Sequence, residues 1–147
     1  MEIRFENKVA FITGAAGGIG YAAARMFAEA GASVVMADLD SRVTDRAKEL
    51  EAEGHNAIGI RCDVSDEVQV KAAVEKAVAV FGKLDIAYNN VGIHAAVRED
   101  LAETEGWDFD RVISVNLRGV WNCMKYELVE MKKHGKGAIV NLSLIHI

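Results

Sequence analysis

The sequence predicts an α/β fold, a doubly wound parallel sheet with helices on both faces. Short apolar runs alternate with segments whose apolar residues recur every three or four positions, the pattern of strands alternating with amphipathic helices. Each connection between successive runs is too long for a hairpin, so we expect parallel strands joined by helical crossovers. The 147 residues, 51% of them hydrophobic and 27% charged, suit one globular domain.

The first strand is expected at Lys8–Ile12, because this apolar run is typical of a strand buried on both faces. A helix should follow, since apolar residues recur at helical spacing from Ile19 to Ala30 and Gly31 stands where a capping glycine belongs. The alternation continues with strands at Ser33–Ala37, Ala57–Arg61 and Leu84–Tyr88 and helices at Thr44–Glu53 and Glu67–Phe81.

A longer helix is expected from Asp108 to His134, followed by a strand at Ala138–Asn141, after which the sheet would be truncated at its fifth strand. Two apolar stripes follow this helix, which predicts two packing partners, the sheet and a second surface. The first stripe contains Ile113, Leu117, Val120, Met124, Leu128 and Met131, and the second contains Val112, Trp121 and Val129.

Composition argues against several classes of partner. The net charge of −5 comes without a basic cluster, so we expect no binding to nucleic acid or to an anionic membrane surface. No apolar run approaches the roughly 20 residues of a membrane span, and we expect a cytoplasmic location. Cys62 and Cys123 are far apart and suit buried apolar positions, and the scattered histidines predict no metal site.

The segment Thr13–Gly20 joins the first strand to the first helix and is rich in glycine. Glycine lets a phosphate approach the backbone, and a helix N-terminus offers free N–H groups and a positive dipole end. A flexible turn is the alternative, but the strand–turn–helix context favours a phosphate-binding loop around Gly14, Gly18, Ile19 and Gly20. The spacing Thr-Gly-x-x-x-Gly-x-Gly resembles that of the short-chain dehydrogenases/reductases.

Asp38 ends the second strand, twenty residues after Gly18 (38 − 18). An acid there accepts hydrogen bonds from adenosine ribose hydroxyls and repels the 2′-phosphate of NADP, so NAD is the expected cofactor and NADP the less favoured one. An ordinary aspartate at a strand end is the alternative. Leu39 follows it, where NADP-using relatives tend to carry a basic residue, although Arg42 lies close enough to oppose the preference.

Three further motifs resemble that family. Asp63–Val64 matches a pair that meets the adenine ring in relatives, and Asn89–Gly92 matches an Asn-Asn-Ala-Gly segment in which Asn90 touches the cofactor ribose and Gly92 completes the motif. Asn116 matches a helix asparagine that helps to hold a water of the proton relay, and an asparagine inside a helix is locally unfavourable. The resemblance thus implies a Rossmann-type domain for NAD.

The resemblance further implies hydride transfer between the nicotinamide and a small alcohol or carbonyl substrate, in an enzyme that is a homo-oligomer at full length. The family's Tyr-x-x-x-Lys pair is missing, since the fourth residue after each tyrosine is Arg25, Gly92 or Glu130. We therefore expect the chain as given to be inactive. A non-catalytic NAD-binding or regulatory module is the alternative.

The strand at Ala138–Asn141 resembles the one that leads to the family's catalytic serine. That serine would stand third after Asn141, where this chain has Leu144, and Ser143 is one residue early. Residues 142–147 read like a translated transposase sequencing adapter. Our hypothesis is that the native domain covers residues 1–141 and that the remainder is a non-native tail.

Overall fold

A computed structural model of the chain describes residues 3–96 and 100–143, so most of the expected tail, including Leu144, lies outside the described residues. Its five parallel strands form one sheet in the order β3-β2-β1-β4-β5. The strands are β1 (Val9–Thr13), β2 (Ser33–Asp38), β3 (Ala57–Arg61), β4 (Ile86–Asn89) and β5 (Ala138–Asn141). The predicted doubly wound parallel sheet is confirmed.

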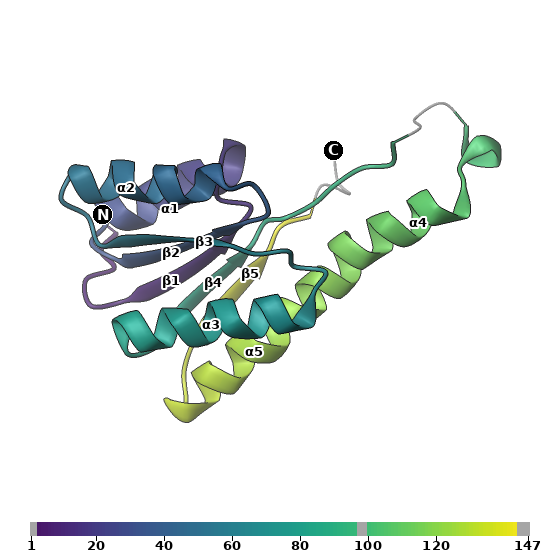
Figure 1. Cartoon of the computed structure of the whole chain (residues 1–147). Helices are drawn as coiled ribbons and strands as arrows, with labels where there is room; N and C mark the ends of the chain where they lie inside the picture. The colour runs from purple at the N-terminus through teal and green to yellow at the C-terminus, as the bar shows by residue number, and fades with distance from the viewer. Residues whose placement is uncertain (1–2, 97–99, 144–147) are drawn as a thin grey trace.

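Helices cover both faces of the sheet (Figure 1), with α1 (Gly18–Glu29) and α2 (Arg42–Ala52) on one face and α3 (Glu67–Phe81) and α5 (Gly119–Lys133) on the other. Side chains of the central strand alternate between two cores. Phe11 packs in the cluster that includes α3 and α5, whereas Ile12 packs in the cluster of α1 and α2. This explains why the run at β1 is apolar throughout.

Several element boundaries differ slightly from those expected. Helix α2 begins at Arg42 rather than Thr44, because the Asp40 carboxylate accepts the Arg42 backbone N–H at 2.9 Å and satisfies the first turn. Strand β4 begins at Ile86 rather than Leu84. The residue before it, Asp85, turns its carboxylate back to the N–H of Val9 at 3.0 Å.

The long helix is not uniform, which corrects the prediction for 108–134. It consists of α4 (Gly106–Ile113), a π-helical segment η2 (Ser114–Arg118) and α5, and a short 3-10 turn η1 (Leu101–Glu103) precedes it. The wider π turn rotates the faces on its two sides relative to one another. Of the first predicted stripe, Met131 is buried but Leu117 and Leu128 are exposed, while the side chain of Glu127, outside both stripes, is buried.

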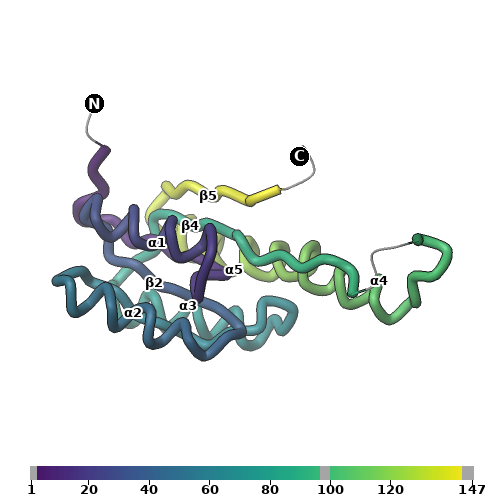
Figure 2. The backbone as a smooth tube through the Cα atoms, turned by 90° about the horizontal axis from the view of Figure 1, so that it is seen from above, coloured from purple at the N-terminus to yellow at the C-terminus, as the bar shows by residue number. Residues whose placement is uncertain are grey.

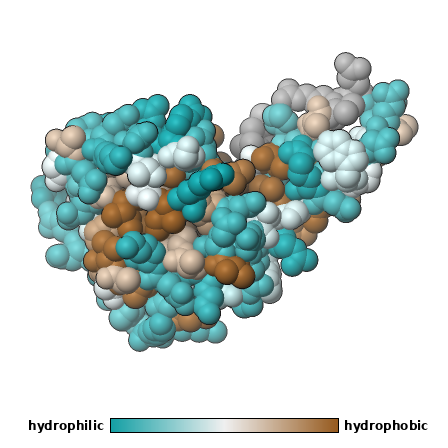
Figure 3. All heavy atoms as spheres, in the orientation of Figure 1, coloured by the Kyte–Doolittle hydropathy of each residue, from teal (hydrophilic) through white to brown (hydrophobic). Residues whose placement is uncertain are grey.

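The two faces of the sheet are not covered equally. The described helices α1 and α2 do not cover β5. In the view from their side of the sheet, β5 lies past the edge of α1 (Figure 2). A groove there is lined by Met26 and Phe27 of α1 and by Tyr88 and Val140 of the sheet. On the face shown in Figure 3, apolar side chains gather in the band between the two helical layers. Among the described helices, none has the length and apolarity to cross a bilayer.

Candidate functional site

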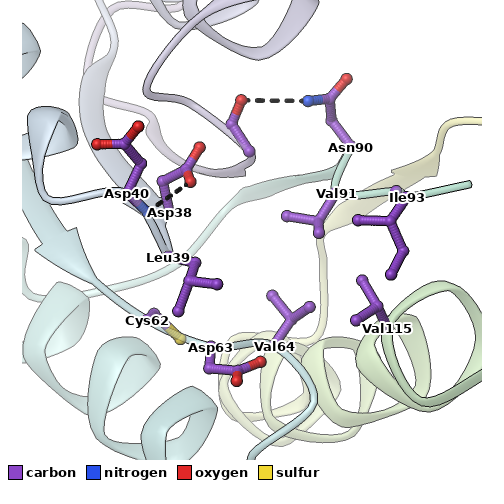
Figure 4. Close-up of a pocket in the computed structure, with 12 residues that line it drawn as sticks. Asp38, Leu39, Asp40, Cys62, Asp63, Val64, Asn90, Val91, Ile93 and Val115 are labelled. Carbon is purple, nitrogen blue, oxygen red and sulfur yellow. Dashed lines mark hydrogen bonds between the residues drawn. The ribbon is translucent and has the colours of Figure 1, made fainter. Parts of the chain in front are cut away.

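A cavity of about 530 Å³ opens at the carboxyl ends of β1, β2 and β4 (Figure 4). The strand order reverses at β1, which has β2 on one side and β4 on the other. Parallel sheets bind ligands at such points, because the loops that leave neighbouring strands diverge to opposite faces. The cavity is lined by Gly14, Asp38, Leu39, Asp40, Cys62, Asp63, Val64, Asn90, Val91, Gly92, Ile93 and Val115.

The glycine loop between β1 and α1 packs backbone against backbone. A Cβ added at Gly20 would lie 2.1 Å from the carbonyl oxygen of Gly14, and one at Gly14, whose φ is +69°, would lie 2.7 Å from Asn90 Nδ2. At Gly17 and Gly18, in contrast, no described atom lies within 4 Å of an added Cβ. Helix α1 begins here without a side-chain cap, so its N-terminal N–H groups are left for an anion.

The carboxylate of Asp38 ties the end of β2 to this loop. Its Oδ2 accepts the N–H of Ala16 at 2.9 Å, and its Oδ1 accepts the N–H of Asp40 at 2.9 Å. Each carboxylate oxygen has two lone pairs, so both oxygens keep an acceptor position for a ligand hydroxyl. Asp38 thus has a structural role in the loop as well as a place in the cavity wall.

Residues that follow β3 form the opposite wall. Asp63 Oδ1 accepts hydrogen bonds from the Ser65 backbone N–H at 2.9 Å and its hydroxyl at 2.7 Å, which fixes this turn. Val64 is buried, and a Cβ added at Gly119 of α5 would lie 2.6 Å from its Cγ2, so the turn packs tightly on that helix. Burial raises the pKa of the Cys62 thiol to about 12, so this thiol is neutral near pH 7.

Asn90 joins the ends of β4 and β1. Its Nδ2 donates to the carbonyl oxygens of Thr13 at 3.2 Å and Gly14 at 3.3 Å, and its backbone N–H donates to Thr13 Oγ1 at 3.0 Å. The side chain of Val91 lies beside Gly14, within 3.4 Å of a Cβ built there. The segment after β4 is therefore held directly against the glycine loop.

Asn116 lies in the π-helical segment rather than in the cavity lining. Its Oδ1 accepts the Ile93 N–H at 2.8 Å and its Nδ2 donates to the Ile93 carbonyl at 2.7 Å. This pair of hydrogen bonds holds the extended segment after Gly92 against η2. The asparagine is thus used for a specific contact, which agrees with its poor fit to a regular helix.

A cluster of polar side chains lies between β4, α5 and β5. Asn89 Nδ2 donates to Glu127 Oε2 at 3.0 Å and to Asn141 Oδ1 at 3.0 Å, which links β4 to α5 and to β5. Burial raises the pKa of the Glu127 carboxyl to about 7, and the hydrogen bond from Asn89 opposes that rise. Among the described residues, Asn89 Oδ1 and Glu127 Oε1 are buried without a hydrogen-bond partner.

The structure brings together most of the residues that the sequence singled out. Seven of them line the cavity, namely Gly14, Asp38, Leu39, Asp63, Val64, Asn90 and Gly92. Gly18, Ile19 and Gly20 lie in the first turn of α1, beside the cavity, and the Ile19 side chain is exposed. Sequence reasoning missed Asp40, Cys62, Ile93 and Val115 as lining residues and Glu127 behind them.

Some of these residues carried a usable signal. Asp40 and Cys62 each lie within two positions of a predicted site residue at a strand end, so proximity alone could have suggested them. Val115 directly precedes Asn116, which the sequence also singled out, whereas Glu127 carried no such signal because it reaches β4 only through tertiary packing.

The sequence profile of the short chain dehydrogenase family matches residues 8–146. The chain belongs to this family. It is 45% identical to cis-4-hydroxycyclohexanecarboxylate dehydrogenase of Sinomonas cyclohexanicum, over 96% of this chain and 56% of the relative. It is 42% identical to cyclohexanol dehydrogenase of Acinetobacter sp. (strain SE19), over 99% of this chain and 58% of the relative.

Solved structures of the same fold match as well. The crystal structure of gox2181 superposes with a TM-score of 0.91 at 29% identity, covering 97% of this short-chain dehydrogenase chain and 55% of that one. The chain therefore spans little more than half the length of the relatives that it matches.

Proposed function

We propose that the protein carrying this chain is an NAD-dependent oxidoreductase that interconverts an alcohol and a ketone or aldehyde. Family membership supports the reaction class, and two relatives are dehydrogenases of cyclic alcohols by name. The observation that carries the proposal is the cavity with a glycine loop at one side and Asp38 at its end. When bound, the nicotinamide cofactor supplies the hydride acceptor.

The residues present fit such a cofactor. The open backbone at Gly17 and Gly18 and the uncapped start of α1 suit the pyrophosphate. Asp38 would accept the hydroxyls of the adenosine ribose, and the turn at Asp63–Val64 would form the wall beside the adenine. Asn90 and Gly92 would meet the second ribose.

Asn116 is proposed to act in the proton relay. Its side-chain amide is already committed to Ile93, so in this structure the residue positions the strand-end segment instead of offering its amide to a ligand. Asn116 would then contribute to a relay indirectly, by holding the backbone of Ile93 in place beside the cavity.

The preference for NAD follows from charge. Three carboxylates, those of Asp38, Asp40 and Asp63, line the cavity. A 2′-phosphate next to Asp38 would be repelled, whereas ribose hydroxyls are neutral hydrogen-bond donors.

We further propose that the full-length protein is a homo-oligomer that packs through the helix of α4, η2 and α5. Large apolar side chains are exposed along this helix, including Trp107, Phe109, Leu117 and Trp121. In Figure 1 α4 projects away from the sheet, and none of the described strands covers it. Several large apolar side chains exposed along one helix suit an interaction site.

Calorimetric titration with ADP-ribose, NAD and NADP tests the cofactor proposal. ADP-ribose contains the parts that Asp38, Asp63 and the glycine loop would hold, so it should bind the protein, and NAD should bind more tightly than NADP. Asp45 is an exposed carboxylate on α2 outside the cavity. Asp45→Asn removes a negative charge there and, as the control, should leave the three affinities unchanged. Failure of ADP-ribose to bind would contradict the assignment of the site.

A further inference from the structure

An arginine beside the adenosine end of the cavity is already occupied by a neighbouring carboxylate. Arg42 is the first residue of α2. Its Nε and Nη2 lie 2.8 and 2.7 Å from Asp40 Oδ2, and its backbone N–H donates to Asp40 Oδ1 at 2.9 Å. Asp40 therefore engages both the charge and the backbone of Arg42.

Asp40 is itself held in place. Its N–H donates to Asp38 Oδ1 at 2.9 Å, and it lines the cavity next to Asp38 (Figure 4). Asp38 thus fixes the backbone of Asp40, and Asp40 fixes the guanidinium of Arg42. The hydrogen bond to Asp40 raises the pKa of Arg42, so the guanidinium keeps its charge near neutral pH.

This arrangement bears on which dinucleotide the site accepts. The 2′-phosphate of NADP carries about two negative charges at neutral pH and is bound in proteins mainly by arginine, through charge-assisted hydrogen bonds. Arg42 has the right chemistry, and Asp40, which holds it, lines the cavity beside Asp38, where that phosphate would be placed. Its charge is neutralised by Asp40.

We propose that Asp40 is a specificity-determining residue of this site. By holding Arg42, Asp40 denies a cation to the 2′-phosphate of NADP and adds to the preference for NAD that Asp38 sets. This inference rests on the proposed cofactor function and extends it from the strand-end carboxylate to a second one. It also explains how a basic residue four positions after Asp38 is compatible with a site for NAD.

The test compares ADP-ribose with its 2′-phosphorylated form by calorimetry, so that the nicotinamide half of the site is not involved. Asp40→Asn keeps an acceptor for the Arg42 N–H and removes the charge that holds the guanidinium. We expect it to tighten binding of the 2′-phosphorylated form by about tenfold, the scale of one charge-assisted hydrogen bond at a partly exposed position. Because Asp40 lines the same cavity, the measured quantity is the ratio of the two affinities in each protein, and this ratio should shift toward the 2′-phosphorylated form.

Two double variants identify the responsible cation. Adding Arg42→Ala to Asp40→Asn should remove most of the gain. Adding Arg61→Ala should leave the gain intact, because Arg61, the matched cation at this edge, donates to the Leu39 carbonyl at 3.1 Å. Arg42→Ala alone should weaken binding of the 2′-phosphorylated form, since it leaves Asp40 without a counter-charge.

Three results would overturn the inference. One is the lack of any gain in Asp40→Asn, and another is an equal gain in Asp40→Asn/Arg42→Ala, which would show that Asp40 acts through its own charge alone. If wild type binds ADP-ribose and either result appears, only the role of Asp40 is wrong. The third result is that wild type binds neither nucleotide. The proposed function then fails, and this inference fails with it. Circular dichroism of each variant verifies that it is folded.

Discussion

The side chain of Asn116 satisfies both backbone hydrogen-bonding groups of Ile93, accepting from its N–H at 2.8 Å and donating to its carbonyl at 2.7 Å. Ile93 lines the cavity, whereas Asn116 lies in the π-helical segment between α4 and α5. The irregular turn of the helix and the extended segment after β4 are therefore fastened together at one residue pair, close to the candidate site.

Replacing Asn116 by alanine should loosen this segment. The loss of two hydrogen bonds is expected to lower the free energy of unfolding by about 1–2 kcal/mol, the reduced value appropriate to exposed partners. Asn116→Asp keeps an acceptor for the Ile93 N–H but sets a carboxylate oxygen against the Ile93 carbonyl, so it should not rescue stability. Urea denaturation measures both, and an alanine variant as stable as wild type would show that the contact is dispensable.

Gly20→Ala should destabilise the glycine loop. The new Cβ would lie 2.1 Å from the Gly14 carbonyl oxygen, so the loop and α1 must separate, at a cost of about 1–3 kcal/mol. Gly17→Ala is the matched control, because its backbone is extended and no described atom lies within 4 Å of the added Cβ. Thermal unfolding should show a lower midpoint for Gly20→Ala only; equal midpoints would contradict the close approach.

Glu127→Gln should change how stability depends on pH. The pKa of Glu127 is raised from 4.5 to about 7 by burial, so its protonated form is favoured in the folded state. Its stabilising contribution is complete below about pH 4.5 and is lost as pH rises through about 7, a change on the order of 3 kcal/mol at 1.36 kcal/mol per pKa unit. Glutamine does not ionise, so the variant lacks this loss.

Urea unfolding of wild type and Glu127→Gln at several pH values between 4.5 and 8 provides the measurement. The difference between the two proteins isolates Glu127, because all other titrating groups are shared. The variant should gain stability relative to wild type as pH rises. A difference that stays constant over this window would mean that Glu127 is ionised throughout.

Asp38→Ala combined with Leu39→Arg should move the cofactor preference toward NADP. The double variant loses the acceptor for the ribose hydroxyls and places a cation at the first position after β2. We expect NAD to bind about tenfold more weakly, equivalent to about 1.4 kcal/mol, and NADP to bind more tightly than in wild type. Unchanged affinity for NAD would refute the assignment of Asp38 to the ribose.

Trp121→Glu on the full-length protein tests the proposed interface. Trp121 is about half exposed on α5, and a charge there would be buried in a subunit contact without a partner. Sedimentation should show smaller species than wild type at micromolar concentration. Val68→Glu, an exposed apolar position at the start of α3, serves as the control and should leave the assembly unchanged. A monomeric wild type would contradict the proposal.

The sequence alone determined the order and type of the main elements. Strands β3 and β5 and helix α3 begin and end at the expected residues, because apolar runs and helical spacing are local properties of the chain. It also singled out the glycine loop and Asp38, since both stand at strand ends whose chemistry follows from residue type and position. The structure brings them to one cavity, as parallel strands require.

Only the tertiary structure decided which face of the long helix is buried. The sequence indicated two apolar stripes along the whole helix, but Leu117, Trp121 and Leu128 are exposed, Asn122 and Glu127 face inward, and the π-helical turn η2 interrupts the regular rotation between α4 and α5. A periodicity argument assumes a constant rotation per residue, and it fails where the helix departs from that value. Contacts such as Asn116 with Ile93, or Asp40 with Arg42, depend on side-chain direction, which local pattern does not specify.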